Sequence, residues 1–138
     1  MVDSKIVKVI GNQDVPIKQK ADGTLYGAGS GKTLKSMPIN ANAAGDNAII
    51  PAVLGMRIKV YAVTLIVSAA VNVYWKSGAN VKTGTMQFGG MGQGYALAVD
   101  PPEYLNSHST NVGEDLILNL SGAVAVSGFV DYWDSDPS

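Results

Sequence analysis

The stretch from residue 57 to residue 76, RIKVYAVTLIVSAAVNVYWK, constrains the fold of this chain more than any other. It is the longest apolar run, it is dense in Val, Ile, Tyr and Trp, and the small residues Ser68, Ala69 and Ala70 interrupt it near its middle. β-Branched and aromatic residues favour strands. The stretch therefore predicts two antiparallel strands joined by a tight turn.

The two arms of this stretch differ in how their apolar residues alternate. In the second arm Val71, Val73 and Trp75 recur with the period of two that is expected of a strand with one buried face. In the first arm both faces are apolar, so both need cover from a second sheet, the chain's own loops or another subunit. One face carries Ile58, Val60, Ala62 and Ile66, and the other carries Tyr61, Val63, Leu65 and Val67.

Short apolar segments punctuated by Gly and Pro recur along the rest of the chain. We count about eight short strands and no convincing helix, which predicts an all-β fold, an antiparallel β-sandwich of jelly-roll type. Its core should come from the apolar positions of alternating strands. These positions are Ile58, Val60, Val63, Leu65, Val71, Val73, Trp75, Leu97, Leu116, Leu118, Val124, Val126 and Val130.

The first third of the chain differs from the rest in composition. Residues 15–47 are rich in Gly, Ala, Ser, Asn and Lys and sustain neither the helical nor the strand period. A structureless stretch of this length is unusual inside a compact domain. We therefore expect an extended N-terminal arm over residues 1–47, with one possible edge strand at residues 5–10, followed by a sandwich domain over residues 48–138.

Composition and charge narrow the range of partners. A chain of 138 residues corresponds to one domain, and the absence of cysteine excludes disulfides and cysteine-ligated metal sites. A net charge of −1 gives no electrostatic reason to expect nucleic acid or an anionic membrane, and the apolar run at residues 61–75 is too short to cross a bilayer. The first residues do not form a secretory signal, so we expect synthesis in the cytoplasm. Only 15% of the residues are charged, as expected of a surface that partners cover.

No motif in the sequence predicts catalysis, a metal site or a cofactor. Residues 27–33, GAGSGKT, are similar to a phosphate-binding loop, but Tyr26 stands where the first glycine is required, and no helix is predicted to follow. His108 is the only histidine, and nothing around it has the pattern of a strained nucleophile turn. We expect a solvated loop histidine and no enzyme activity.

Residues 73–133 contain a strand ending in a KSG turn, a TG step, a Gly-rich loop, a GE-L-LNLS stretch and a last strand of the form V-V-G-hydrophobic-aromatic. Members of a group of small tailed-bacteriophage virion proteins share these elements, and the region resembles that group. The order and spacing of these elements carry the resemblance, which extends back to Arg57 and covers more than half of the chain. The elements are Lys76-Ser77-Gly78, Thr83-Gly84, residues 89–94, residues 113–121 and residues 124–132.

The resemblance implies a capsid decoration or cement protein on the surface of the virion, which binds the major capsid protein on the outside of the head. It also implies a homo-oligomer, with a trimer favoured because trimeric plugs fit the three-fold positions of a capsid lattice. One alternative is a carbohydrate- or host-binding virion module, such as a head fibre or tail component, and another is a small hydrolase. The aromatic residues that would form the floor of a carbohydrate site are Tyr74, Trp75, Tyr132 and Trp133, although strand aromatics more often lie in a core.

Two sets of residues are candidate contact sites under this interpretation. The few larger apolar residues of the arm are candidates for capsid attachment, with the alternative that they pack on their own sandwich. The second apolar face of residues 61–67 and the small residues before the last strand are candidates for self-association, with the alternative that the small residues face solvent. The attachment candidates are Ile17, Leu25, Leu34, Met37 and Ile39, and the self-association candidates are Tyr61, Val63, Leu65, Val67, Ala123 and Ala125.

Overall fold

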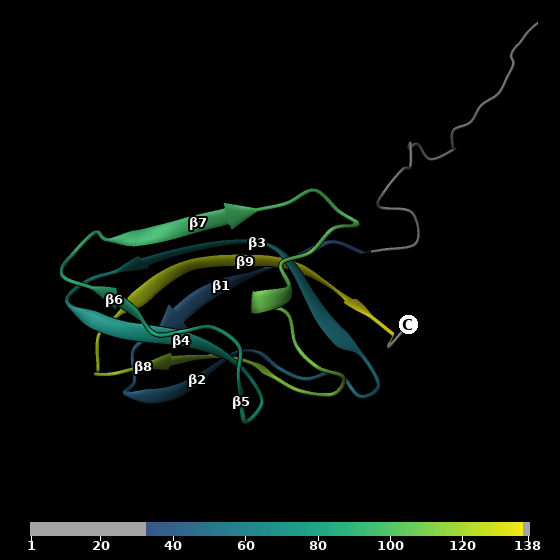
Figure 1. Cartoon of the computed structure of the whole chain (residues 1–138), viewed down its shortest axis with the longest axis horizontal. Helices are drawn as coiled ribbons and strands as arrows, with labels where there is room; N and C mark the ends of the chain where they lie inside the picture. Colours follow the sequence, from purple (N-terminus) through teal and green to yellow (C-terminus); the bar gives the residue numbers. More distant parts are fainter. Residues whose placement is uncertain (1–32, 137–138) are drawn as a thin grey trace, which may run out of the picture. The chain divides into compact units, whose positions relative to one another are not determined.

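The computed structural model describes residues 33–136 of the chain. This part contains two antiparallel sheets and one short 3-10 helix, η1 (Figure 1). The elements in chain order are β1 (Lys35–Ala41), β2 (Gly45–Ile50), β3 (Arg57–Val67), β4 (Val71–Ser77), β5 (Asn80–Val81), β6 (Met86–Phe88), β7 (Gly94–Ala98), η1 (Asn106–His108), β8 (Leu116–Leu120) and β9 (Val126–Ser135).

The strand pairing follows the order of a jelly roll. β1 pairs with β9, β2 with β8, β3 with β7, and β4 with β5 and β6, so the chain forms one long antiparallel ribbon. Pairing of β3 with β9 and of β4 with β8 then rolls this ribbon into two sheets, β1-β9-β3-β7 and β2-β8-β4-β5, with β6 on β4 (Figure 1). The predicted antiparallel β-sandwich of jelly-roll type is confirmed.

Residues 57–76 form two strands, but these strands are not a hairpin. β3 belongs to the four-stranded sheet and β4 to the five-stranded sheet, so the small residues between them connect the two sheets. The Ser68 N–H donates to the carbonyl oxygen of Ala125 at 3.0 Å at this crossing. β3 and β4 each have one strongly apolar face. Because the two sheets pack face to face, the apolar face of β3 is buried against that of β4 and its sheet. The predicted pairing of the two arms is therefore wrong.

A β-bulge explains why β3 looks apolar on both faces. The register between β3 and β9 shifts between Val60 and Ala62, which makes Tyr61 the extra residue. An extra residue reverses which alternate positions face the core. One continuous inward face therefore replaces the two that the sequence predicts. The buried residues of β3 are Ile58, Val60, Val63, Leu65 and Val67.

The core lies between the inner faces of the two sheets. All the predicted core residues are buried except Leu97, which is 44% exposed on the outermost strand β7, and Val124, which is partly buried against the core. The core also contains residues that the sequence did not assign to it. These are Ile39, Ala41, Ile49, Ile50, Val67, Leu120 and Tyr132.

The structure places the start of the sandwich at β1 rather than at residue 48. Residues 35–47, which their composition assigned to the arm, form β1 and the first part of β2. β1 alternates buried Ile39 and Ala41 with exposed residues that include Pro38, and it is paired with β9 from the far end of the chain. So short a pattern gives little local signal. The candidate strand at residues 5–10 and the glycines of the GAGSGKT motif lie outside the described residues.

Side-chain hydroxyls extend the pairing of β3 beyond β7. Ser109 Oγ accepts a hydrogen bond from the Val60 N–H, and Thr110 Oγ1 accepts one from the Ile58 N–H, each at 2.9 Å. The hydroxyls take the place of the carbonyl groups that a neighbouring strand would present. This pairing holds the preceding helix η1, with His108 at its end, against the core.

Gly128, the one glycine of β9, should not tolerate a side chain. Its φ is +136°, and a Cβ at this position would meet the carbonyl oxygen of Thr64 on β3. Gly128→Ala should therefore lower the free energy of unfolding by about 3 kcal/mol, measured by chemical denaturation. Gly122→Ala is the matched control, because a Cβ there meets nothing within 4 Å. Equal stability of the two variants would contradict the close approach of β9 to β3.

Candidate functional site

One side of the β1-β9-β3-β7 sheet packs on the core, and the other side faces away from it. Because strand side chains alternate between faces, the outward residues are those that lie between the buried ones. Where all four strands pair, the registers align these residues in three rows of four, which we call the low-charge face, and Lys59 of β3 lies outward beyond it. The rows are Ser36, Asp131, Ala62 and Ala98; Pro38, Phe129, Thr64 and Ala96; and Asn40, Ser127, Ile66 and Gly94.

The low-charge face combines exposed apolar groups with a near absence of charge. Asp131 is the only charged residue among its members. Phe129 and Ile66 are 41% and 46% exposed, and they lie on adjacent rows among small neighbours such as Ala96. A single exposed apolar residue is ordinary, but a surface with two of them and little charge is typical of a protein-docking surface.

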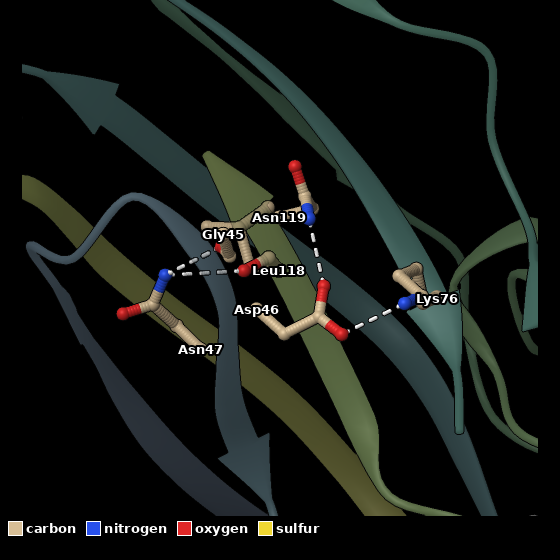
Figure 2. Close-up of polar contacts among 6 residues, drawn as sticks. All are labelled: Gly45, Asp46, Asn47, Lys76, Leu118 and Asn119. Carbon is tan, nitrogen blue, oxygen red and sulfur yellow. Dashed lines mark hydrogen bonds and ion pairs between the residues drawn. The ribbon is translucent and has the colours of Figure 1, made fainter. Parts of the chain in front are cut away.

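The outward side of the other sheet carries an ion pair. In Figure 2, Asp46 of β2 lies between Asn119 of β8 and Lys76 of β4. Asn119 Nδ2 donates to Asp46 Oδ1 at 2.7 Å, and Lys76 Nζ donates to Asp46 Oδ2 at 2.8 Å. The hydrogen bond from Lys76, followed by that from Asn119, lowers the pKa of the Asp46 carboxyl. Asn47, on the other face of β2, donates its Nδ2 hydrogen to the Gly45 carbonyl oxygen at 3.1 Å (Figure 2). These polar groups are satisfied within the chain.

A buried polar cluster lies where η1 meets the core. Trp75 Nε1 is 2.6 Å from Tyr95 Oη, which is 2.9 Å from His108 Nε2. Ser107 Oγ is 2.8 Å from His108 Nδ1. His108 is only 4% exposed, so the predicted solvated loop histidine is wrong.

The tautomer of this cluster is assigned by giving every hydrogen a partner. The indole N–H of Trp75 can only donate, so Tyr95 Oη accepts that hydrogen, and in this assignment the Tyr95 hydroxyl hydrogen is donated to His108 Nε2. Nδ1 then carries the imidazole hydrogen and donates it to Ser107 Oγ. Ser107 therefore accepts a hydrogen bond from the imidazole, whereas a nucleophilic serine must give its proton to one.

Burial keeps both titratable members of the cluster neutral near pH 7. Desolvation lowers the pKa of His108 to about 4 and raises the pKa of Tyr95 to about 12, although the hydrogen bond from Trp75 partly offsets the second change. A neutral cluster whose polar atoms bond one another stabilises the packing of η1 on the core.

Two elements of the virion-protein resemblance contact each other. Ser77 Oγ, in the KSG turn, donates to Glu114 Oε1 at 2.6 Å, and Asn111 Nδ2 donates to the same oxygen at 3.2 Å. The hydrogen bond from Ser77 is the largest cause that lowers the pKa of Glu114. A Cβ on Gly78 would lie 3.1 Å from the Glu114 carboxyl carbon. These motif residues therefore tie the end of β4 to the loop before β8.

The structure separates the attachment candidates. Ile39 is buried in the core and Met37 packs against it, so for these two the alternative of packing on their own sandwich is correct. Leu34 is 45% exposed just before β1. Ile17 and Leu25 lie outside the described residues, and their role stays a prediction.

The self-association candidates are separated in the same way. Val63, Leu65 and Val67 are at most 1% exposed inside the sandwich, so they are not available to another subunit. The physical reason is the bulge, which turns all three toward the core. Tyr61 is half-buried beside the Trp133 ring, at a centroid distance of 5.8 Å. The remaining two candidates, Ala123 and Ala125, are exposed.

Sequence reasoning missed the members of the low-charge face that carry its apolar groups. Phe129 could have been found, because the period of two that places Val126 and Val130 inward places Phe129 outward. Ile66 had no such signal, since its face could be assigned only once the bulge in β3 was known.

Acidification should destabilise the protein through His108. The pKa of this group is about 4 in the folded chain against 6.5 for an exposed histidine, so the unfolded chain takes up the proton first as the pH falls. Stability is therefore lost as the pH drops through the window between these values, by about 2 kcal/mol from pH ~7.5 to pH ~5 in urea unfolding. In His108→Gln this part of the loss should vanish. Equal losses in both proteins would contradict a buried neutral histidine.

Comparison with known proteins does not assign the chain to a family. Among the described residues, no helix is long and apolar enough to cross a membrane, and no group of three or more His, Cys, Asp or Glu residues could hold a metal ion. Comparisons with protein-family models, curated proteins and solved structures found no match.

Proposed function

We propose that this chain is a virion structural protein of the capsid-decoration type, which binds the outside of a phage head through the low-charge face. The resemblance of residues 73–133 to small virion proteins suggests the setting, and the low-charge face supplies the contact surface. Its partner would be the major capsid protein, and its work would be binding energy rather than chemistry.

The low-charge face is the observation that supports this proposal. Interfaces between proteins are depleted of charge at their centre and use a few large side chains as anchors. Phe129 and Ile66 have the size and exposure of such anchors, and the sheet beneath them is held rigidly by pairing on both sides of β3 and β9. Many copies, each with a modest contact, would add up across a capsid lattice.

The two alternatives have less support. A carbohydrate module needs exposed aromatic faces, but Trp75, Tyr132 and Trp133 are at most 6% exposed, which leaves only half-buried Tyr74 of the four predicted residues. A hydrolase needs an activated nucleophile, and Ser107 bonds its histidine in the opposite sense. A non-catalytic binding role fits these arrangements better.

Binding to undecorated heads built from the cognate major capsid protein tests the proposal. The wild-type protein should cosediment with such heads and raise the temperature at which they rupture. Phe129→Asp should weaken binding by about tenfold or more, because it places a charge at the centre of the contact. Asn72→Asp, which adds the same charge on the outward side of β4, is the matched control and should bind like the wild type.

Two outcomes would contradict different parts of this proposal. If the wild-type protein does not bind the heads, the decoration role is wrong. If Phe129→Asp binds as tightly as the wild type, attachment does not use the low-charge face. Light scattering of the free protein tests the expected homo-oligomer independently of both.

A further inference from the structure

β7 leaves one edge of its sheet without a partner strand among the described residues. It is the outermost strand of the β1-β9-β3-β7 sheet and pairs on one side only, with β3 (Figure 1). Val99, just after β7, donates its N–H to the Tyr61 carbonyl oxygen of β3 at 2.8 Å, which sets the phase of the ladder. Alternate residues of an antiparallel strand direct their backbone groups to opposite sides. The residues whose N–H and C=O groups point to the open edge are therefore Gly94, Ala96 and Ala98.

This edge lacks the features that normally protect an edge strand. Such strands are usually blunted by charge, proline or a bulge. β7 has the sequence GYALA, its register with β3 is uninterrupted, and Leu97 is 44% exposed. β1, the other outermost strand of the same sheet, carries Lys35 and Pro38. β7 is therefore the strand of this sheet to which a further strand can be added.

We propose that β7 of a second copy of this chain pairs antiparallel with this edge about a two-fold axis at Ala96. In that register Ala96 lies opposite its own counterpart and Gly94 lies opposite Ala98, so every outward backbone group of β7 finds a partner. Tyr95 lies opposite Leu97, which covers the exposed leucine. A two-fold contact brings residues near the axis against their own copies, where any charge would meet a like charge. β7 carries none.

The pairing would also double the low-charge face. A two-fold axis between antiparallel strands is perpendicular to the sheet, so the two faces would lie on the same side of one continuous sheet. A five-residue edge buries little area, and we expect association in the micromolar range or weaker. The contact predicts a dimer in place of the trimer that the resemblance implies, and it holds whether or not the protein decorates a capsid.

Engineered cysteines test the register, because the chain contains no native cysteine. In the proposed pair the two Ala96 Cα atoms lie about 5.5 Å apart, within disulfide range. Ala96→Cys should therefore form a disulfide-linked dimer under mild oxidation. Ala98→Cys is the control. In the proposed register residue 98 of one copy lies opposite Gly94 of the other, so the two cysteines at position 98 are too far apart to form a disulfide. Equal cross-linking of the two variants would overturn the proposed register.

Sedimentation of the uncross-linked protein tests the contact itself. The wild-type protein should change from monomer to dimer between about 10 µM and about 1 mM. Ala96→Lys, which sets two lysines opposite each other, should weaken the dimer by about tenfold or more, whereas Ala48→Lys on the outward side of β2 should leave it unchanged. A wild-type monomer throughout this range, a trimer, or equal behaviour of the two lysine variants would overturn the proposal. No phage heads are needed, so its failure is distinguishable from failure of the decoration role.

Discussion

The bulge at Tyr61 is the feature on which the rest of the sheet depends. β3 is the longest strand of the described residues and pairs with β9 along almost its whole length. Which of its residues point to the core therefore determines which residues of the whole four-stranded sheet do so. Without the extra residue, Ile58 and Val60 would face the opposite side from Val63 and Leu65, and one pair would lie in solvent. With it, both pairs enter the same core.

The same bulge determines what the molecule presents to a partner. Because Val63, Leu65 and Val67 point inward, the outward positions of β3 beyond the bulge are Ala62, Thr64 and Ile66. The small side chains of β7 and the phenyl ring of Phe129 on β9 complete a surface with very little charge. The charge of the other sheet is arranged differently, because the Asp46 carboxylate bonds both Lys76 and Asn119 (Figure 2). The low-charge face thus carries one charged residue, whereas the outward side of the other sheet carries an ion pair.

The buried polar groups of the fold serve its architecture. Ser109 and Thr110 complete the hydrogen bonding of β3, Ser77 joins β4 to Glu114, and His108 bonds Tyr95. A buried polar atom without a partner costs about 1–3 kcal/mol, so each of these contacts restrains the loop that supplies it. The loops around η1 are therefore fixed by the core.

The sequence by itself determined the fold class and most of the core, because the period of two along strands such as β4 and β8 depends only on neighbouring residues. Three features were decided by tertiary structure. β1 is stabilised by β9, which is far from it in the sequence. β3 and β4 each pair with other strands and not with each other. The bulge appears only in the register of β3 with β9. The outer face and edge strand proposed as contact surfaces follow from those registers. Local sequence could not reveal them, because pairing between residues far apart in the chain selects which side of each strand is buried.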